Sequence, residues 1–195
     1  MPATKHLYTI AEYLALEEKS EGKNEYHDGE IIAMAGGSYR HSKLKTNLIR
    51  TLGNRLMGHR CEPLDSDMRV RVEKRLSYFY PDAQILCTPP TFDVDDPKKT
   101  TIVNPTVVFE VISESSEAYD RGEKFSMYRD MASLQEYVLI SQETPRVEVY
   151  LRQADSDWLF SHFDGLEAVA KLRSVKIELP LAEIYAGLDF GPERA

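Results

Sequence analysis

The sequence predicts an α/β protein in which buried strands and amphipathic helices share one core, and three segments support this prediction. Val107 to Ile112 is a run of β-branched and aromatic residues, typical of a strand that is buried on both faces. Residues 39–57 place apolar side chains at helical spacing, which predicts an amphipathic helix. Arg146 to Leu151 alternates apolar and polar side chains, as a strand with one buried face does. A sheet with helices packed against it follows from these patterns.

The length and composition of the chain fit a single domain over residues 1–195. The chain has 195 residues, of which 42% are hydrophobic, enough to bury a core. It contains no apolar run near the roughly 20 residues of a membrane span, and no apolar signal-peptide segment at its start. We therefore expect a cytoplasmic protein that does not bind membranes. Cys61 and Cys87 are too few for a disulfide framework, so reduced thiols are expected.

Charge is distributed unevenly along the chain. The formal net charge of −8 argues against a protein that coats nucleic acid nonspecifically. Residues 31–61, however, contain no Asp or Glu and carry six basic residues: Arg40, Lys43, Lys45, Arg50, Arg55 and Arg60. This segment offers a local positive face to phosphate groups, while the acidic remainder supplies solubility.

The chain is expected to begin with a helix and a hairpin. Residues 9–17 predict a short helix, because Glu12 stands three residues after Thr9 and the two can form a capping box. Residues 23–35 contain two alternating runs around Asp28-Gly29, a favoured two-residue hairpin turn.

The basic helix predicted over residues 39–57 follows a glycine-rich entry, Gly36-Gly37-Ser38. Free backbone N–H groups and the helix dipole favour anions at such a start, which makes it a candidate phosphate site. His41 and Lys45 project within the apolar arc of this helix. A histidine in that position is often a satisfied core residue, and this alternative stays open beside a functional role.

Most of the remaining chain is expected to be β-structure. Strand patterns cover residues 68–72, 77–87, 136–140, 146–151 and 158–163, and a short strand with a helical turn closes the chain within residues 176–188. Residues 89–103 are rich in Pro, Asp, Lys and Thr and are expected to form a long polar loop. Asp82 stands at the mouth of a strand after Tyr80-Pro81, a setting that suits either a turn or a site residue.

Glu110 and Lys124 are charged residues in segments that are otherwise apolar. Glu110 interrupts the buried strand and shares one face with Val108 and Ile112, because side chains alternate along a strand. The next helix is expected to begin with Asp120 as its N-cap. Lys124 and Arg121 fall within the apolar arc of that helix, which is formed by Phe125, Met127, Tyr128, Met131 and Ala132. An unpaired buried charge costs several kcal/mol, so Glu110 and Lys124 need each other, a metal or a ligand.

Asp82, Glu110 and Lys124 are the residue types that a metal-dependent phosphodiesterase needs. Two carboxylates can hold Mg²⁺ or Mn²⁺, which polarises the phosphoryl group and acidifies a bound water, while a lysine orients that water or offsets charge on the phosphate. Hard oxygen ligands favour these ions over zinc, and the chain has neither a His-x-x-x-His nor a Cys-x-x-Cys motif. The lysine is expected to reach both Asp82 and Glu110.

At these residues the sequence resembles the PD-(D/E)XK nuclease superfamily, and more closely the Uma2 family of restriction endonuclease-like proteins, formerly grouped as a domain of unknown function. The resemblance covers nearly the whole chain, from Tyr8-Thr9 to residues 179–185. Its best-matching segments are residues 26–31, Arg40-His41-Ser42, residues 66–70, Tyr80-Pro81-Asp82, Glu110-Val111-Ile112-Ser113 and Tyr119 to Phe125.

The resemblance implies a restriction endonuclease-like core, a mixed sheet flanked by helices, with extra C-terminal β-strands that extend the sheet or build a homodimer contact. It implies a DNA substrate, and Mg²⁺ or Mn²⁺ held by Asp82, Glu110 and the backbone carbonyl of Val111. The superfamily motif would place its lysine at Ile112, so the resemblance implies that the lysine has moved to the helix as Lys124.

Glu25 and His41 match further positions of the same cleft, as an auxiliary acid and as a phosphate or water contact. For Glu25 the ordinary alternative is a solvated hairpin carboxylate. Arg121 is the nearby cation that could substitute for Lys124. The candidate nucleic-acid contacts are Arg40, Lys43, Lys45 and Arg121.

Three functions therefore compete, of which a Mg²⁺-dependent endonuclease acting on DNA is favoured. The second is a non-catalytic nucleic-acid-binding or interaction module on a nuclease scaffold, against which the intact Asp82, Glu110 and Lys124 count. The third is a metal-independent hydrolase with His41 as general base, oriented by Asp82 or Glu25, but no persuasive serine or cysteine nucleophile accompanies it. Metal dependence distinguishes all three.

Overall fold

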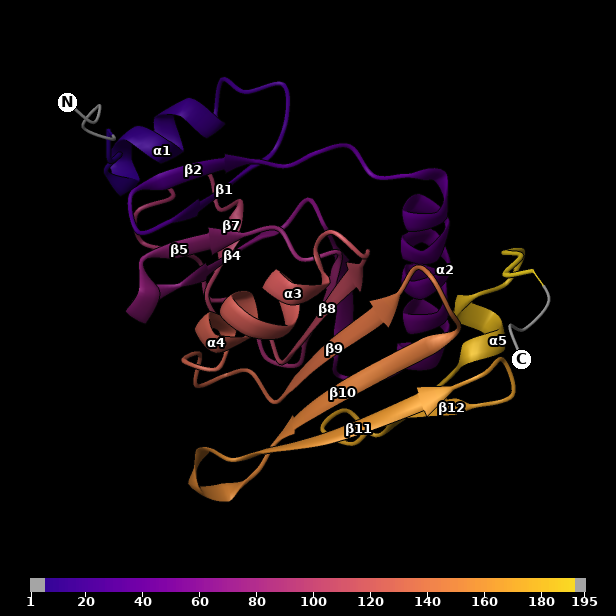
Figure 1. Cartoon of the computed structure of the whole chain (residues 1–195). Coiled ribbons are helices and arrows are strands. Elements are labelled where there is room, and N and C mark those ends of the chain that lie inside the picture. The colour runs from indigo at the N-terminus through magenta and orange to yellow at the C-terminus, as the bar shows by residue number, and fades with distance from the viewer. Residues whose placement is uncertain (1–5, 192–195) are drawn as a thin grey trace.

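The computed structural model describes residues 6–191, which form two mixed β-sheets and a separate β-hairpin (Figure 1). The central sheet has the order β11-β10-β9-β8-β6-β3 and comprises β3 (Glu62–Asp65), β6 (Ala83–Leu86), β8 (Val107–Ile112), β9 (Glu136–Ser141), β10 (Arg146–Arg152) and β11 (Trp158–Asp164). The second sheet has the order β2-β1-β5-β4-β7 and comprises β1 (Asn24–His27), β2 (Glu30–Ala33), β4 (Arg69–Val72), β5 (Ser77–Phe79) and β7 (Thr101–Ile102). The hairpin pairs β12 (Val169–Leu172) with β13 (Ile177–Pro180).

Few helices accompany the sheets, and they lie on both sides of the central one (Figure 1). They are α1 (Ile10–Glu17), α2 (Tyr39–Leu56), α3 (Glu117–Tyr119), α4 (Phe125–Tyr128) and α5 (Leu181–Ile184), with a π-helical turn at Asp120–Lys124 between α3 and α4. Between residues 6 and 191, no helix combines the length and apolar character needed to cross a membrane. Mixed sheets flanked by helices are the fold class that the sequence predicts.

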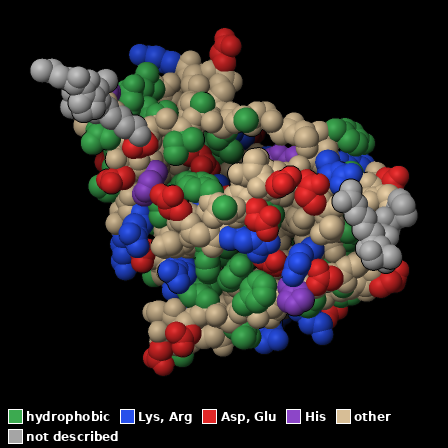
Figure 2. Space-filling model, in the orientation of Figure 1, with side chains coloured by type: hydrophobic (Ala, Val, Ile, Leu, Met, Phe, Trp, Pro, Cys, Tyr) green, Lys and Arg blue, Asp and Glu red, His purple; other side chains and the backbone are tan. Residues whose placement is uncertain are grey.

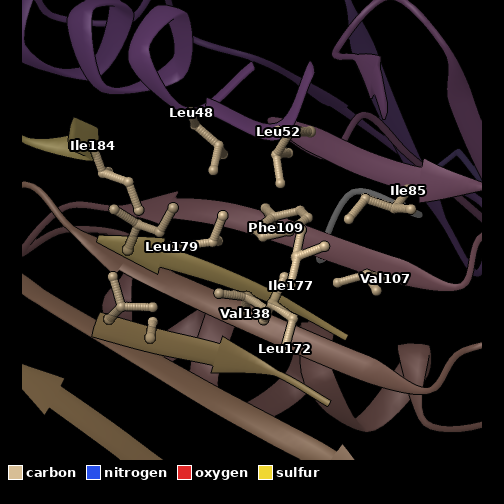
Figure 3. Packing of buried hydrophobic residues seen from close by; sticks show 14 of the residues in the cluster. Leu48, Leu52, Ile85, Val107, Phe109, Val138, Leu172, Ile177, Leu179 and Ile184 are labelled. Carbon is tan, nitrogen blue, oxygen red and sulfur yellow. The ribbon is translucent and has the colours of Figure 1, made fainter. Parts of the chain in front are cut away.

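The strand β8 separates the two main hydrophobic clusters of the protein. All six of its residues are buried, as the unbroken apolar run predicts. Phe109 packs with Leu52 of α2 and with the β12–β13 hairpin on one face of the sheet (Figure 3). Val108 packs with Tyr128 of α4 on the other face. Glu110 lies on this second face, as predicted, and so meets the π-helical turn rather than α2.

The N-terminal predictions are confirmed in detail. The hydroxyl of Thr9 accepts from the Glu12 backbone N–H and the Glu12 carboxylate accepts from the Thr9 N–H, which completes the capping box of α1. Asp28 and Gly29 both have positive φ, 45° and 90°, the conformation that a two-residue hairpin turn requires. The basic helix, predicted over residues 39–57, is α2, with Ser38 as its N-cap.

The helix after β8 begins earlier than predicted, and Asp120 is not its N-cap. The Asp120 backbone N–H donates to the Ser116 carbonyl, so Asp120 already lies inside the helix. From this residue the chain forms a π-helical turn, a wider form that is common at functional sites. Asp120 and Lys124 are both buried and their charged atoms are 3.9 Å apart, so the turn directs both side chains inward.

Two elements escaped the sequence prediction. The polar loop predicted over residues 89–103 contains β7, and it is fixed to β4 by buried ion pairs of Arg69 with Asp96 and of Arg71 with Asp93. The strand β12 follows β11 without a strong alternating pattern, and it is stabilised by pairing with β13. Both depend on partners that are distant in sequence.

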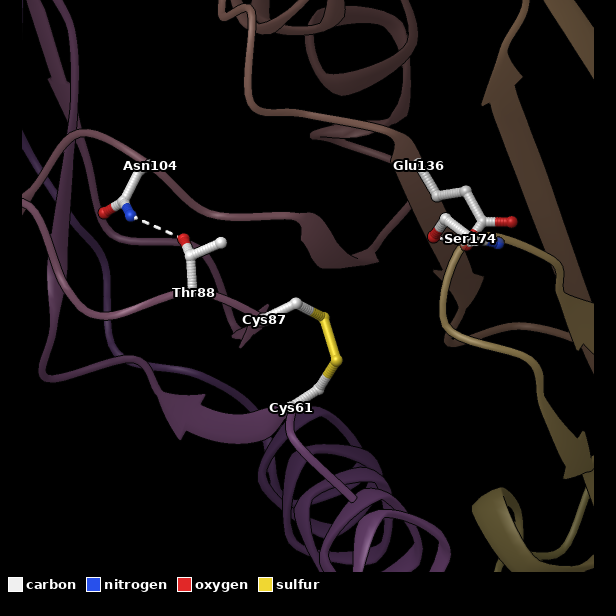
Figure 4. The surroundings of a disulfide bond; sticks show 6 residues. All are labelled: Cys61, Cys87, Thr88, Asn104, Glu136 and Ser174. Carbon is white, nitrogen blue, oxygen red and sulfur yellow. Dashed lines mark hydrogen bonds between the residues drawn. A yellow bond between two sulfur atoms is a disulfide. The ribbon is translucent and has the colours of Figure 1, made fainter.

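Cys61 and Cys87 form a disulfide, so the expectation of reduced thiols is wrong for this structure (Figure 4). The two residues flank the antiparallel pair of β3 and β6, in which Glu62 lies opposite Leu86. This register brings the cysteines together although they are 26 residues apart in sequence. The bond joins the segment that follows α2 to the end of the strand that carries Asp82 near its start.

Reduction of this disulfide should lower the free energy of unfolding by about 3.5 kcal/mol, the loop-closure entropy expected for a separation of 26 residues. Urea unfolding of the parent with and without a phosphine reductant measures the difference. The Cys61→Ala, Cys87→Ala double variant is the control and should not respond to the reductant. Identical midpoints for the parent in both buffers would show that the thiols are not bonded in solution.

Candidate active site

A cluster of buried charges lies where β1, β6, β8 and the π-helical turn meet. It contains five residues that are at most 7% exposed: Glu25, Asp82, Glu110, Asp120 and Lys124. His41 and Lys45 of α2 lie at its rim, with side chains 22% and 28% exposed. We call these seven residues the charge cluster. Buried charges at this density need mutual compensation, which makes their pairing the central feature of the site.

Lys124 lies among three carboxylates of the charge cluster. Its Nζ is 2.9 Å from Glu110 Oε1 and 3.0 Å from Glu25 Oε1, with Asp120 Oδ1 further away at 3.9 Å. The pairing of Lys124 with Glu110 is therefore as predicted from the sequence. Asp82 is not among its ion-pair partners, and Glu25 takes that place. Burial lowers the pKa of Lys124, but the three carboxylates outweigh it and raise the pKa well above its usual value, so the ammonium stays charged.

Asp82 is bound from two sides. Its Oδ1 is 3.0 Å from His41 Nε2 and 3.3 Å from Lys45 Nζ, and its Oδ2 accepts from the Val111 backbone N–H at 2.7 Å. Burial raises the pKa of Asp82, yet the interactions with His41, Lys45 and the Val111 N–H outweigh burial and lower it below its ordinary value. Asp82 is therefore an ionised carboxylate that is anchored to β8.

Glu110 behaves in the opposite way to Asp82. Burial raises its pKa well above the ordinary value, and the nearby carboxylates of Asp120, Asp82 and Glu25 add to this effect, whereas Lys124 opposes it. The pKa of Asp120 is likewise raised by burial. The pKa of Asp82 is thus lowered and that of Glu110 is raised, although both carboxylates belong to one site. Such an arrangement is common in active sites.

The charge cluster contains more negative than positive charge. Four carboxylates face two lysines, so the net charge is −2 when all six are ionised and His41 is neutral. Burial is the main cause of the raised pKa of Glu110, and this excess adds to it, since a proton can supply part of the missing positive charge. A divalent cation would supply the whole of it.

The donor set fits Mg²⁺ or Mn²⁺ by its chemistry. Asp82, Glu110 and the Val111 carbonyl offer hard oxygen atoms, and Mg²⁺ commonly takes only one or two carboxylates and fills its other positions with water and phosphate oxygens. Between residues 6 and 191, no group of three or more His, Cys, Asp or Glu side chains forms a metal centre by side chains alone.

The start of α2 is held against β8 through Gln142. The Ser38 hydroxyl donates to Gln142 Oε1, and Gln142 Nε2 donates to the Val111 carbonyl at 3.5 Å. Gly37 allows this arrangement, because a Cβ there would lie 2.4 Å from His41 Nδ1. The absence of a side chain at Gly37 thus leaves room for the His41 ring to lie against Asp82.

The predicted nucleic-acid contacts lie in different surroundings. Lys45 contacts Asp82 and the Ser66 hydroxyl at the rim of the cluster. Arg40 donates to the carbonyls of Gln142 and Asp189. The Lys43 side chain lies against Gly187. On the face shown in Figure 2, basic and acidic side chains are interspersed. A positively charged surface for nucleic acid on this face would therefore be small.

Arg121 lies apart from the charge cluster, although it was expected on the same inward arc as Lys124. Its guanidinium pairs with Glu117 and with Glu148 of β10. The wider π-helical turn separates the directions of neighbouring side chains, and Glu148 supplies a partner that the local sequence does not reveal. The second basic residue of the charge cluster beside Lys124 is therefore Lys45 and not Arg121.

Three residues of this neighbourhood were not predicted from the sequence. Asp120 was interpreted as an N-cap, although its spacing of four from Lys124 is the signal that would have placed both on one side. Tyr119 begins the matched segment Tyr119 to Phe125, but no role was assigned to it, and Gln142 carries no local signal, since a glutamine after a strand is ordinary. Their positions follow only from tertiary contacts.

Comparison with known proteins supports the resemblance. Residues 10–182 match the family model Uma2, described as "Putative restriction endonuclease". Two uncharacterized proteins of Synechocystis sp. are similar: sll1609 is 38% identical over 175 residues, which covers 90% of this chain and 98% of the relative. The other, slr1290, is 37% identical over 180 residues and covers 92% of both chains.

The fold also matches a solved structure. A crystal structure from Anabaena variabilis ATCC 29413, described as a putative nuclease belonging to DUF820, aligns with a TM-score of 0.73 over 91% of this chain and 97% of that chain. At 17% sequence identity this likeness concerns the fold. Together with the match over residues 10–182, it confirms the family suggested by the sequence motifs. The chain belongs to the Uma2 family and shares the fold of the Anabaena variabilis protein.

Proposed function

We propose that this protein is a Mg²⁺-dependent endonuclease that hydrolyses phosphodiester bonds of DNA. The observation that carries the proposal is the charge cluster, in which Asp82, Glu110 and Lys124 lie together with an excess of two negative charges. Such an excess favours a divalent cation, and membership of the Uma2 family favours a nucleic-acid substrate. The cytoplasmic location and the homodimer expected from the sequence stay predictions.

In this proposal Asp82, Glu110 and the Val111 carbonyl hold Mg²⁺ or Mn²⁺. When bound, the ion would polarise the phosphoryl group and lower the pKa of a water molecule. Asp82 suits this role because its pKa is low and its Oδ2 is fixed by the Val111 N–H. Lys124 would orient the attacking water or offset charge that develops on the phosphate, at a fixed position in a site of low dielectric constant.

Glu25 and His41 support these residues in different ways. Glu25 Oε1 accepts from Lys124 Nζ and from the Tyr80 backbone N–H, so Glu25 positions the lysine that acts on the phosphate. His41 and Lys45 are the more exposed members of the cluster and would contact phosphate oxygens at its rim. Arg40, Lys43 and Arg121 are proposed to contact the DNA backbone farther from the scissile bond.

The proposal is tested by incubating the purified protein with supercoiled, linear, branched and single-stranded DNA in Mg²⁺, Mn²⁺ and EDTA. We expect cleavage in either metal and none in EDTA. DNA binding without cleavage in any metal would favour the non-catalytic alternative. Cleavage in EDTA would favour a metal-independent hydrolase.

Asp82→Ala and Glu110→Ala should each abolish binding of Mn²⁺, because one remaining carboxylate retains little affinity for the ion. Isothermal titration calorimetry measures the binding directly. Asp164→Ala is the matched control, since it removes a half-exposed carboxylate on β11 and should leave Mn²⁺ binding unchanged. Parent-like binding by both site variants would show that the metal site has been misassigned.

Lys124→Met should abolish cleavage and lower the free energy of unfolding by about 3 kcal/mol in EDTA, because Glu25 and Glu110 lose their shared partner while they stay buried. Metal binding should largely persist. The Lys124→Met, Glu25→Gln double variant should recover part of the stability and still fail to cleave. Chemical denaturation and a DNA cleavage assay separate the two effects, and full cleavage by Lys124→Met would contradict the assigned role.

Glu110→Gln should stabilise the protein in EDTA, by an amount that grows with pH. The pKa of Glu110 is raised in the folded state, so its contribution to stability is fully present below the ordinary pKa of 4.5 and is lost as the pH rises. Gln mimics the protonated side chain and does not suffer this loss. Melting temperatures at about pH 5 and about pH 8 compare the variant with the parent.

Glu143→Gln, at an exposed position, is the control for this comparison and should change neither melting temperature. A Glu110→Gln variant that melts several degrees below the parent at about pH 8 would identify Glu110 and Lys124 as a structural ion pair instead.

A further inference from the structure

The hydroxyl of Tyr119 is a buried hydrogen-bond donor without a partner. Tyr119 ends α3, directly before the π-helical turn that carries Asp120 and Lys124. Its ring packs against the hydrophobic cluster on the Glu110 face of β8, yet its hydroxyl oxygen is buried and makes no hydrogen bond. Because a buried polar group without a partner costs stability, a position that needed only the ring would be served better by phenylalanine.

Two other tyrosines at the charge cluster do have acceptors. The Tyr128 hydroxyl donates to Glu110 Oε1 at 3.5 Å, and the Tyr137 hydroxyl donates to the Asp120 carbonyl at 3.0 Å. Tyr119 differs from both, although acceptors are near. The carboxylates of Glu25 and Asp120 influence its hydroxyl, but these groups are engaged by Lys124.

The Tyr119 hydroxyl keeps its proton in these surroundings and can therefore donate a hydrogen bond. Burial raises the pKa of Tyr119, and the charge of Glu25 raises it further, so the hydroxyl keeps its proton at neutral pH. The charges of Glu25, Glu123 and Asp120 act on it together with that of Lys124. A further ligand with negative charge therefore needs compensation, which Lys124 and a bound cation would supply. An oxygen atom of a phosphate group that enters the cluster is the acceptor that meets these conditions.

We propose that the Tyr119 hydroxyl is a substrate-binding group that donates a hydrogen bond to a non-bridging oxygen of the scissile phosphate. The inference rests on the proposed nuclease function and adds to the site a donor that is neither a proposed metal ligand nor one of the basic residues expected to contact DNA. A neutral donor suits this place, because it binds the phosphate without adding a charge to the pairing of Lys124 with Glu25 and Glu110.

Tyr119→Phe tests this role, because it removes the hydroxyl and keeps the ring. The variant should melt at or above the temperature of the parent in EDTA, bind a short fluorescent DNA duplex about tenfold more weakly, and cleave about tenfold more slowly in Mg²⁺. DNA affinity is measured in Ca²⁺ and again in EDTA. The affinity for Mn²⁺ alone should equal that of the parent.

Tyr185→Phe is the matched control. The Tyr185 hydroxyl is buried, lies within hydrogen-bond distance of the carbonyls of Ser141 and Arg146 as acceptors, and accepts from the Arg146 N–H, so its loss should lower the melting temperature and leave DNA affinity unchanged. If Tyr119→Phe behaves like this control, the hydroxyl is structural and the proposal fails. If it weakens Mn²⁺ binding instead, the hydroxyl contacts the metal shell and the phosphate assignment is wrong.

These outcomes are separable from a failure of the proposed function. A parent protein that cleaves DNA, with a Tyr119→Phe variant that binds and cleaves equally well, overturns only the role of Tyr119. A parent that cleaves nothing in any metal, with a variant that binds DNA about tenfold more weakly, supports the phosphate contact and overturns the nuclease.

Discussion

The position of the Lys124 ammonium between Glu110 and Glu25 is the interaction on which the site depends. All three groups are buried, and the two carboxylates would be costly without the ammonium. Glu110 comes from a central strand, Glu25 from the hairpin of the second sheet, and Lys124 from the π-helical turn. This one ion-pair triad therefore ties three separate parts of the fold together, and it forms without any bound ligand.

The remainder of the fold serves to hold these groups in place. Asp82 is anchored to β8 by the Val111 N–H, and His41 approaches it because α2 begins beside Gln142 and Gly37 leaves room for the ring. The disulfide lies at the opposite end of the strand that follows Asp82. Helices and strands thus carry the charged groups. The packing of the rest of the fold offsets the unfavourable free energy of the excess negative charge.

Much of this arrangement could be predicted from the sequence, because it depends on local pattern. The apolar run of Val107 to Ile112 gives the buried strand, and a carboxylate inside it has to face a cation or a metal. Lys124 stands out for the same reason on an amphipathic helix. Family motifs then connect Asp82, Glu110 and Lys124. The match over residues 10–182 confirms the family, and the roles of these three residues stay predictions.

The features that escaped prediction depend on tertiary contacts. Glu25 was weak as a candidate because a hairpin carboxylate is usually solvated, and only the folded chain brings it to Lys124. Asp120 was misread as a cap, since a π-helical turn has no local signal. Cys61 and Cys87 meet through the register of β3 and β6 rather than through any spacing rule. Arg121 turns away because Glu148, on a distant strand, compensates its charge.

The central claim is that the excess negative charge of the cluster binds a divalent cation between Asp82 and Glu110. Anomalous diffraction from crystals grown with Mn²⁺ tests it most directly. We expect one strong peak about 2.1 Å from a carboxylate oxygen of each residue, with the Lys124 ammonium still paired with Glu25. An empty cluster in which Lys124 and Lys45 remain the partners of these carboxylates at saturating Mn²⁺ would contradict the claim.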